Sequence, residues 1–426
     1  MDANVVASGT GSGTQLLRTV GRRQPLVWKF GGTSVADHGR LRAVAERMVA
    51  AQRAGHDVVA ILSAMGKSTD ALSAMAYEMS ARPPLRELDA LLSVGESIAC
   101  ALASMAVADL GSHAVSLSGP QAGIRTDDNH GNARLNDVAP QRIREALADG
   151  SIVLVTGFQG MSESGDVTTL GRGGSDASAV AVAAALGARE CEIFTDVPAV
   201  FTADPRIVPD ASRLGLIRHE EMLEMAEAGA AVLQPRAVEL AMTHGINIHL
   251  RSSFSSEDGT WIRQAEGRFE ARGAFDVTGI AHRRQESLYG VRDVEVSEVA
   301  AALAARGIAM GAAVPRAGGL LEFTAPGVGA PETTAALDAM EIPAKVNEDL
   351  GSIAVVGLGI GRRPDIIAHS LAALRVAGIA PRLVTTTPGR VSVLVDSNLL
   401  EEAVRVLHAT FIPVAPDPRL MASPAA

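Results

Sequence analysis

The most constraining stretch of this sequence is a glycine-rich turn that leads directly into an alanine-rich run. The turn reads Leu-Gly-Arg-Gly-Gly-Ser-Asp over residues 170–176, and the run that follows, 177–186, contains neither glycine nor proline. A tight turn at the start of a helix exposes backbone N–H groups, and the helix dipole favours negative charge there. The stretch therefore predicts a turn–helix unit of an α/β fold that holds an anion. The competing interpretation is a structural turn in which Arg172 and Asp176 pair with each other.

A second turn of this type lies near the start of the chain. An apolar run at 26–30 leads into Gly-Gly-Thr-Ser at 31–34 and then into a helical pattern over 35–53. Lys29, Lys67 and Lys345 are the only lysines in a sequence that otherwise uses arginine for its positive charge. A retained lysine is consistent with a need for a compact ammonium that arginine cannot supply. The competing interpretation is an ordinary βα turn whose lysine reaches solvent. No GxxxxGK[ST] motif is present, so this is not a Walker A loop.

Strand and helix patterns alternate through the first 260 residues. Short apolar runs lie at 26–30, 57–62, 114–118, 151–156 and 192–195, with helical patterns between several of them. This alternation predicts a three-layer α/β/α sandwich around a mostly parallel sheet, with ligands at the carboxyl ends of the strands. Segment 119–135 is polar and is predicted to be a long loop that serves as a mobile lid or as a binding loop.

Glu96 lies in an otherwise apolar helical run, Leu-Leu-Ser-Val-Gly-Glu-Ser-Ile-Ala. A carboxylate on such a face should be paired or aimed into a cavity, because burying an isolated charge is costly. The alternative is a glutamate that reaches solvent through the gap left by Gly95. The sequence favours neither.

The composition excludes several classes of protein. The 426-residue chain has a formal net charge of −10, which argues against a nucleic-acid partner. Two cysteines, Cys100 and Cys191, cannot build a disulfide framework or a cysteine zinc cluster. No segment is expected to span a bilayer, and residues 1–24 lack the apolar core of a signal peptide. We therefore expect a cytoplasmic protein without a membrane partner, with residues 1–24 as a flexible extension.

Several separated motifs together resemble the aspartate kinases of the amino-acid kinase superfamily. They are Lys-Phe-Gly-Gly-Thr-Ser at 29–34, Thr-Thr-Leu-Gly-Arg-Gly-Gly-Ser-Asp at 168–176, Phe-Thr-Asp at 194–196 and Phe-Thr-Ala-Asp-Pro-Arg at 201–206. Their order and spacing fit the family over about residues 26–410, which is more specific than any single motif. The resemblance implies a catalytic sandwich over 25–262, a linker over 263–275, and two α+β ACT-like units of βαββαβ type over 276–426.

The activity implied by the resemblance is ATP-dependent phosphorylation of the side-chain carboxylate of L-aspartate to 4-phospho-L-aspartate, the first step toward the aspartate-family amino acids. Such a transfer depends on positioning and charge neutralisation. ATP and Mg²⁺ are implied as cofactors, with Mg²⁺ bridging phosphates and no dedicated protein metal site. In that scheme Lys29 stabilises the transferring phosphoryl group, Arg172 binds the substrate α-carboxylate, and Glu96 pairs with its ammonium.

The residues implied by the resemblance fall into three groups. The catalytic group is Lys29, Arg172 and Asp176. The substrate group is Ser63, Thr69, Glu96, Arg172 and Ser175. The nucleotide group is Gly31, Gly32, Thr33, Gly173, Gly174, Thr195, Asp196, Phe201 and Arg206.

The sequence departs from the family pattern at the nucleotide site. Phe201 stands where the family usually has tyrosine, and Ala231 and Gln234 stand where it usually has lysine and histidine. Losing one phosphate contact would cost roughly 1–3 kcal/mol, so we expect a raised Michaelis constant for ATP. Two alternatives stay open. One is a catalytically weak homologue that acts as a regulatory or binding partner, and the other is a kinase for a related acidic amino acid.

The C-terminal pattern resembles the paired ACT domains that bind amino-acid effectors. Its second half predicts strands at 352–357, 382–386 and 390–395 and helices at 365–377 and 399–410. The effector motifs are altered, because Arg-Asp-Val-Glu at 292–295 and Thr-Thr-Pro-Gly-Arg at 386–390 replace the usual segments, and Pro388 removes an N–H donor. The sequence leaves open whether these units bind an effector, with weakened feedback, or serve as a scaffold. A homo-oligomer is expected, dimeric through these units.

Overall fold

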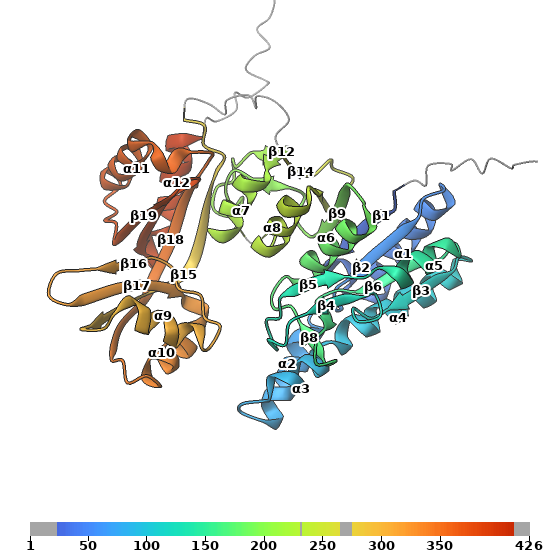
Figure 1. The fold of residues 1–426 in the computed structure, drawn as a ribbon. Helices are drawn as coiled ribbons and strands as arrows, with labels where there is room; N and C mark the ends of the chain where they lie inside the picture. Colours follow the sequence, from blue (N-terminus) through green and yellow to red (C-terminus); the bar gives the residue numbers. More distant parts are fainter. Residues whose placement is uncertain (1–23, 231, 265–274, 413–426) are drawn as a thin grey trace, which may run out of the picture.

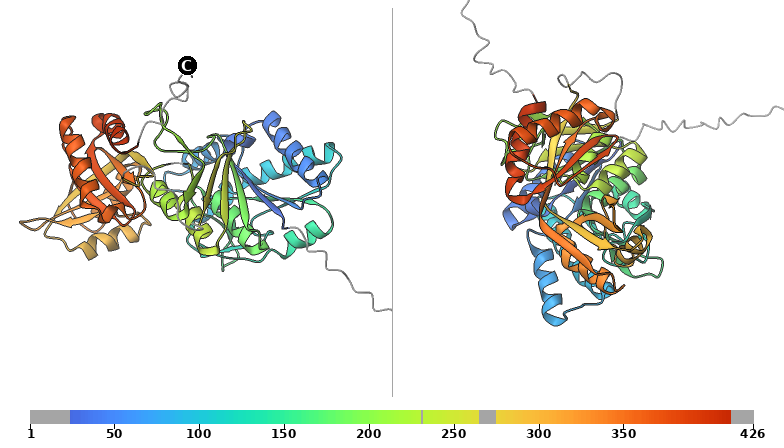
Figure 2. Two further views of the ribbon diagram at one scale, coloured as in Figure 1. Left: turned by 90° about the horizontal axis from the view of Figure 1, so that it is seen from above. Right: turned by 90° about the vertical axis from the view of Figure 1, so that its left-hand side faces the viewer.

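The computed structural model describes residues 24–230, 232–264 and 275–412, which form a sandwich and a second sheet side by side (Figures 1 and 2). The predicted extension 1–24 and linker 263–275 lie almost entirely outside the described residues, as does Ala231. Helix α7 (His219–Glu227) of the sandwich lies next to the second sheet in Figure 1.

An eight-stranded sheet forms the centre of the sandwich. All its neighbouring strands pair in parallel except β13 and β14, which are antiparallel, so the predicted mostly parallel sheet is confirmed. Every residue of β2 and β6 is buried, as expected for central parallel strands. The strands in sheet order are β12 (Leu216–Arg218), β14 (Thr260–Arg263), β13 (Asn247–Ser252), β9 (Glu190–Thr195), β1 (Leu26–Phe30), β2 (Val58–Leu62), β6 (Ile152–Thr156) and β3 (Ala114–Leu117).

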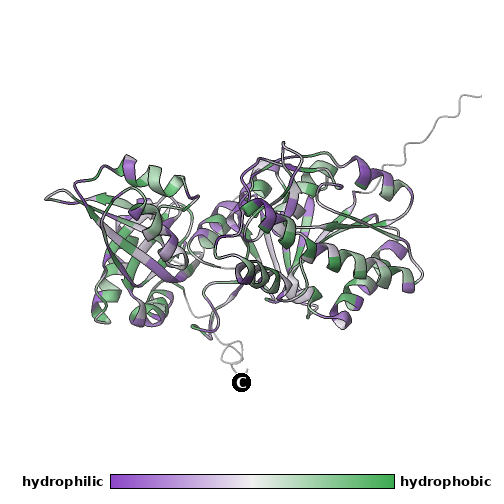
Figure 3. Cartoon of the chain, turned by 90° about the horizontal axis from the view of Figure 1, so that it is seen from below, coloured by the Kyte–Doolittle hydropathy of each residue, from purple (hydrophilic) through white to green (hydrophobic). Residues whose placement is uncertain are grey.

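Helices cover both faces of this sheet. The helices α1 (His38–Arg53) and α4 (Val94–Asp109) pack on one face, and α5 (Gln141–Ala148), α6 (Gly174–Leu186), α7 and α8 (Pro235–His244) pack on the other. Because side chains alternate along a strand, Trp28 and Phe30 of β1 face α1, whereas Val27 and Lys29 face α6. In Figure 3 the hydrophobic colour lies mainly on the strands and on one side of many helices, which is the pattern of a layered core.

Smaller elements flank the sandwich. They are the sheet β5 (Leu135–Val138), β4 (Ile124–Thr126), β7 (Gln159–Met161), β8 (Val167–Thr169), the pair β10 (Val200–Phe201) and β11 (Arg213–Leu214), and the helices η1 (Gly32–Val35), α2 (Ser68–Met79) and α3 (Leu85–Leu92). The predicted loop 119–135 therefore contains strand β4. Its alternating pattern, with Ile124 and Thr126 buried, is too short to be recognised in sequence.

Segment Leu85–Asp109, formed by α3 and α4, is long and apolar enough to cross a membrane by length and composition alone. The expectation that no run is long and apolar enough to span a bilayer was therefore wrong. Length and composition are weak evidence for a membrane span, because the core helices of other proteins share them. Here α4 buries Ala99, Cys100 and Val107 in the core shared with α1, and Glu96 is buried at its start. The helix is thus one layer of the sandwich.

The second sheet has six antiparallel strands. Each of its two longest strands runs through both ACT-like units: residues 286–292 of β15 pair with β17, whereas residues 279–283 pair only with the end of β18, which in turn pairs with β20. The register shifts between Arg283 and Leu288 mark the change from one unit to the other. The strands in sheet order are β16 (Ala313–Pro315), β17 (Leu320–Pro326), β15 (Gly279–Arg292), β18 (Ala344–Val356), β20 (Arg390–Asp396) and β19 (Leu383–Thr387).

Four helices and three short 3-10 turns complete this part. They are α9 (Val296–Ala304), η2 (Gly327–Gly329), α10 (Ala330–Asp338), η3 (Ile360–Arg362), α11 (Pro364–Val376), η4 (Ser397–Leu399) and α12 (Leu400–Phe411). The strands and helices predicted from residue 352 onward are confirmed to within a few residues, except that β18 begins well before that position.

Polar contacts fix the second sheet to the end of α7. The Thr387 hydroxyl donates to Glu224 Oε1 at 2.6 Å. The Arg390 guanidinium lies 3.2 Å from the Glu224 carboxylate and 3.3 Å from that of Glu227. The Thr278 hydroxyl donates to Glu221. The altered Thr-Thr-Pro-Gly-Arg segment is therefore one of the parts of the second unit that dock on the sandwich, and His408 is another, 2.9 Å from the Thr202 hydroxyl.

Candidate active site

Lys29 and Asp176 join the two glycine turns that stood out in the sequence. Lys29 Nζ lies 2.6 Å from Asp176 Oδ1, and the two side chains are only 11% and 9% exposed. The interpretation in which Lys29 reaches solvent is therefore wrong. The interpretation in which Asp176 pairs with Arg172 is also wrong, because Asp176 pairs with Lys29 and Arg172 lies exposed on the turn. Gly31 donates its N–H to the Phe194 carbonyl at 3.1 Å, and a Cβ on Gly31 would lie 3.5 Å from the ammonium. The first glycine turn therefore lies directly beside the Lys29 ammonium.

The turn at 170–176 has a backbone that only glycine adopts readily. Gly171 and Gly173 have φ values of +74° and +69°, in the left-handed region. A Cβ on Gly173 would lie 1.5 Å from Cγ of Gln234, so the residue that replaces the family's histidine packs directly against this turn. Ser175 is buried in the first turn of α6, and a Cβ on Gly157, at the end of β6, would lie 2.7 Å from its hydroxyl.

Glu96 is 3% exposed and lies against the turn that follows β2. Its Oε1 accepts the Ala64 N–H at 3.1 Å, whereas Oε2 is buried without a hydrogen-bond partner among the described residues. A Cβ on Gly95 would lie 2.8 Å from that of Ala64, so close packing fills the expected gap and the solvated alternative is wrong. Burial raises the pKa of Glu96 to about 7, and the hydrogen bond from Ala64 opposes this only in part.

The turn after β2 brings further predicted residues to the same edge. Ser63 donates its N–H to the Phe30 carbonyl at 3.1 Å, and Gly66 donates to the Gly32 carbonyl at 3.0 Å. A Cβ on Gly32 would lie 2.9 Å from the Ala64 carbonyl oxygen. Thr69 lies half-buried in the first turn of α2. The turns after β1 and β2 therefore lie side by side, as expected for neighbouring parallel strands.

The predicted nucleotide residues are less closely gathered. Thr195 ends β9, next to β1, and its hydroxyl donates to Asp196 at 3.2 Å. Phe201 lies in β10 with the guanidinium of Arg213 5.9 Å from its ring centre.

Two predicted nucleotide residues make other contacts. The Arg206 side chain is 84% exposed and forms an ion pair with Asp204 at 2.7 Å. Thr33 is exposed in η1, where its carbonyl accepts a hydrogen bond from Arg40 at 2.6 Å.

The sequence analysis assigned no role to Asp89, which lies at the centre of a buried cluster. Asp89 is fully buried and accepts from the Thr169 hydroxyl at 2.5 Å, the Gly131 N–H at 3.0 Å and His130 Nδ1 at 2.8 Å. It therefore ties the segment after β4 to the strand that leads into the glycine turn. The signal in the sequence was an aspartate inside an apolar helical run, the same signal that singled out Glu96.

Arg236 was also missed. From the first turn of α8, its Nη1 donates to the Ala133 carbonyl at 2.8 Å and reaches the Leu170 carbonyl at 3.4 Å. It thus supports the glycine turn from the side of Gln234.

Comparisons with known proteins agree with this geometry. The model of the amino acid kinase family matches residues 24–252, and an ACT domain model matches residues 353–411. The aspartokinase of Mycolicibacterium smegmatis is 43% identical over 403 residues, covering 91% of this chain and 96% of its own. An aspartokinase of Thermus thermophilus is 39% identical over 401 residues, covering 91% of this chain and 98% of its own.

Among solved structures, E. coli aspartokinase III in complex with aspartate and ADP has the same fold, with a TM-score of 0.78 and 23% identity over 91% of this chain and 99% of that one. The family model matches more than half of the chain, and the relatives align over nearly their whole length. The chain therefore belongs to the amino acid kinase family and, within it, to the aspartokinases.

Proposed function

We propose that this protein transfers the γ-phosphoryl group of ATP to the side-chain carboxylate of L-aspartate and releases 4-phospho-L-aspartate. The observation that carries the proposal is the buried ion pair between Lys29 and Asp176, at the point where the two glycine turns meet. The aspartokinase relatives, which align over more than nine-tenths of this chain, supply the reaction type.

The site has the features that phosphoryl transfer requires. Lys29 supplies an ammonium held in a fixed position, which can stabilise negative charge as it shifts during transfer. Gly32, Gly173 and Gly174 lie so close to neighbouring atoms that a side chain would collide there, and a Cβ on Gly31 would touch the Lys29 ammonium at 3.5 Å. Such glycine turns allow backbone N–H groups to approach phosphate oxygens. ATP, when bound, supplies the phosphoryl group.

Mg²⁺ would be held mainly by the nucleotide. Within the described ranges, no three His, Cys, Asp or Glu side chains gather closely enough to hold an ion by themselves. Mg²⁺ commonly keeps several waters and binds through substrate phosphates, so this arrangement fits an ion that arrives with ATP.

Aspartate would bind between Glu96 and Arg172. Glu96 Oε2 is buried and has no hydrogen-bond donor among the described residues, which leaves it available for the substrate ammonium. Arg172 offers a planar guanidinium that matches the α-carboxylate. Ser63, Thr69 and Ser175 would line the remaining space, and the reacting carboxylate would then face Lys29.

The nucleotide would occupy the other side of the site. Thr33, Thr195, Asp196, Phe201 and Arg206 would line it, with Arg206 released from Asp204 to reach the phosphates. Gln234 packs against Gly173, so this side of the site remains filled although the lysine and histidine that are usual in the family are absent. We therefore expect weaker binding of ATP, whereas phosphoryl transfer to aspartate should still occur.

We further infer a cytoplasmic homodimer joined through the ACT-like units, with an amino acid as effector. Cys100 and Cys191 are both buried free thiols, which fits a reducing compartment. The Thr387 and Arg390 contacts with α7 offer a route from an effector-binding unit to the catalytic sandwich.

The direct test traps the acyl phosphate with hydroxylamine in the presence of ATP and Mg²⁺, and compares L-aspartate with L-glutamate and N-acetyl-L-glutamate. We expect hydroxamate from L-aspartate. Hydroxamate formed faster from another acid would identify a kinase for that acid. No product from any of them would favour a regulatory homologue instead.

A further inference from the structure

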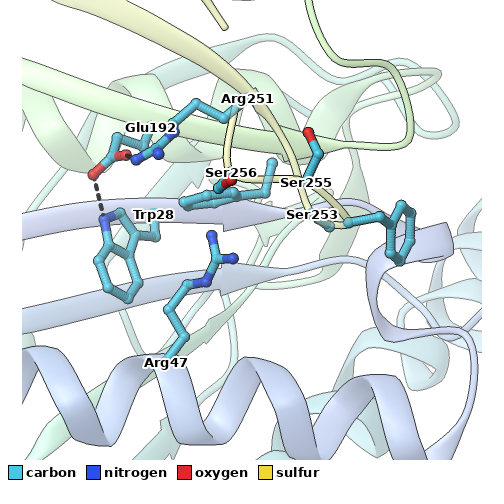
Figure 4. Close-up of a pocket in the computed structure, with 9 residues that line it drawn as sticks. Trp28, Arg47, Glu192, Arg251, Ser253, Ser255 and Ser256 are labelled. Atoms are coloured by element: carbon cyan, nitrogen blue, oxygen red, sulfur yellow. Dashed lines mark hydrogen bonds and ion pairs between the residues drawn. The ribbon is translucent and has the colours of Figure 1, made fainter. Parts of the chain in front are cut away.

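A second pocket lies on the opposite face of the strand that carries Lys29. Its volume is about 500 Å³, within the range of small-molecule sites. Trp28 and Phe194 come from β1 and β9, Arg47 from α1, and the serines from the segment that follows β13 (Figure 4). Because Trp28 and Lys29 point to opposite faces of β1, this pocket is distinct from the proposed phosphoryl-transfer site.

The two arginines of the pocket differ in their partners. Arg251 Nη1 lies 3.1 Å from Glu192 Oε2, and Glu192 Oε1 accepts the Trp28 Nε1–H at 2.7 Å. The carboxylate of Glu192 is thus engaged on both oxygens. Arg47 is half-buried and has no carboxylate within ion-pair distance among the described residues. Its guanidinium lies 4.7 Å from the ring centre of Phe194.

The pocket therefore carries a net positive charge beside aromatic side chains that are themselves largely buried, with Trp28 6% and Phe194 1% exposed. Burial and the like charge of Arg251 both lower the pKa of Arg47, and the negative charge of Glu192 opposes this only in part. Figure 4 shows the Arg47 side chain rising from α1 toward β1 and β9, with Ser253, Ser255 and Ser256 on the segment across from it. Hydroxyl groups and a guanidinium can together complete the hydrogen bonds of a bound anion.

We propose that this pocket binds a small organic carboxylate with a flat apolar body, the carboxylate meeting the Arg47 guanidinium and the body lying against Trp28 and Phe254. One net positive charge matches a monoanion, and the planar guanidinium matches the two oxygens of a carboxylate. Phe254 is 52% exposed although the Arg40 guanidinium lies 4.8 Å from its ring centre, so part of its apolar surface is left for a ligand to cover. Ser253 donates to Ser34 Oγ at 2.6 Å, so the pocket borders the first glycine turn.

Trp28 provides a built-in reporter for binding. The chain has two tryptophans. Trp261 does not line this pocket but stacks on His249, with ring centres 3.9 Å apart, and His249 lies 3.8 Å from Glu192. In a Trp261→Phe background, Trp28 is the remaining tryptophan, and excitation selective for tryptophan follows its indole. Benzoate is a suitable probe, with inorganic phosphate as the test of a different anion and sodium chloride as the ionic-strength control.

We expect benzoate to change the Trp28 emission saturably and sodium chloride to have no such effect. Arg47→Gln should weaken benzoate binding by about tenfold to a hundredfold, because it removes a charge-assisted hydrogen bond. Arg42→Gln is the matched control on the same helix, since Arg42 pairs at the surface with Asp109 at 2.9 Å. It should bind benzoate as the parent does.

Three results would overturn the proposal: no saturable response to benzoate, equal affinity in the Arg47→Gln and Arg42→Gln proteins, or tighter binding of phosphate than of benzoate. Equilibrium dialysis of labelled benzoate repeats the comparison without relying on fluorescence. Melting curves of both variants verify that each is folded. None of these readings depends on kinase activity, so the outcome is independent of the proposed function.

Discussion

The ammonium of Lys29 lies 2.6 Å from the carboxylate of Asp176, and the two residues come from turns far apart in the sequence. Both side chains are almost entirely buried, so each charge depends on the other for compensation. The pair therefore has a structural role in addition to the chemical one proposed for Lys29, and experiments must separate the two.

A double-mutant cycle separates these roles. Lys29→Met leaves the buried Asp176 carboxylate without its partner and should lower the free energy of unfolding by about 3–5 kcal/mol. Adding Asp176→Asn should restore most of that loss, because no uncompensated charge is then buried. Urea denaturation measures the free energy of unfolding of the wild type, the two single variants and the double variant. Equal stability of the single and double variants would mean that the two charges are not coupled.

The raised pKa of Glu96 predicts a pH-dependent stability. The folded protein binds a proton at Glu96 more tightly than the unfolded chain, with a pKa of about 7 against an ordinary value of 4.5. The contribution of Glu96 to the free energy of unfolding is therefore most favourable below pH 4.5, and it is lost as the pH rises to 7. Relative to Glu96→Gln, the wild type should lose about 3 kcal/mol across this range. The exposed Glu87→Gln is the control, and a wild-type curve parallel to that of Glu96→Gln would contradict the assignment.

The same carboxyl group predicts how substrate binding depends on pH. If the ionised form of Glu96 pairs with the ammonium of aspartate, the Michaelis constant for aspartate should fall as the pH rises through about 7. Glu96→Gln should have a high Michaelis constant that is insensitive to pH in this range. A steep pH dependence that persists in Glu96→Gln would assign the titration to another group.

The packing of Gln234 on the glycine turn can be tested with two alanine substitutions at the ends of α6. Gly173 and Gly187 flank this helix, both with left-handed backbones, but a Cβ on Gly187 meets nothing within 4 Å. Gly187→Ala should cost about 1–2 kcal/mol through backbone strain alone. Gly173→Ala should cost about 1–3 kcal/mol more, because its methyl group collides with Gln234. Equal losses in thermal unfolding would argue against this contact.

The connection between the second sheet and the sandwich depends on Arg390. Arg390→Gln leaves Glu224 and Glu227 without their guanidinium and should cost about 1–3 kcal/mol. Arg382→Gln breaks an exposed pair with Asp396 in the same sheet and should cost at most about 1 kcal/mol. Urea unfolding should be less cooperative in Arg390→Gln only. Indistinguishable transitions in the two variants would indicate that α7 does not depend on this contact.

The local parts of this fold could be predicted from the sequence. Strand β1 and its glycine turn, the turn before α6, and the strands and helices of the second ACT-like unit all depend on short apolar runs and on glycines next to them. These signals lie within a few residues of the structure that they specify. The positions of the predicted site residues relative to one another needed the family resemblance as well.

The long-range parts could not be predicted. The Asp89 cluster joins residues from α3, the segment after β4 and the end of β8, and nothing in any one segment identifies its partners. Strands β15 and β18 each serve two units, because their pairing changes at a bulge that no sequence pattern marked. The partner of Asp176 was likewise set by how the sheet brings β1 beside α6.

The most direct test of the account measures hydroxylamine-trapped product from ATP and L-aspartate in the Lys29→Met/Asp176→Asn protein, whose stability should be close to that of the wild type. Lys345→Met, which removes an exposed lysine of β18, is the control and should keep full activity. The account predicts a loss of at least about a hundredfold in turnover for the double variant. A folded double variant that still turns over at the wild-type rate would contradict the claim that the buried pair at the meeting of the two glycine turns carries the chemistry.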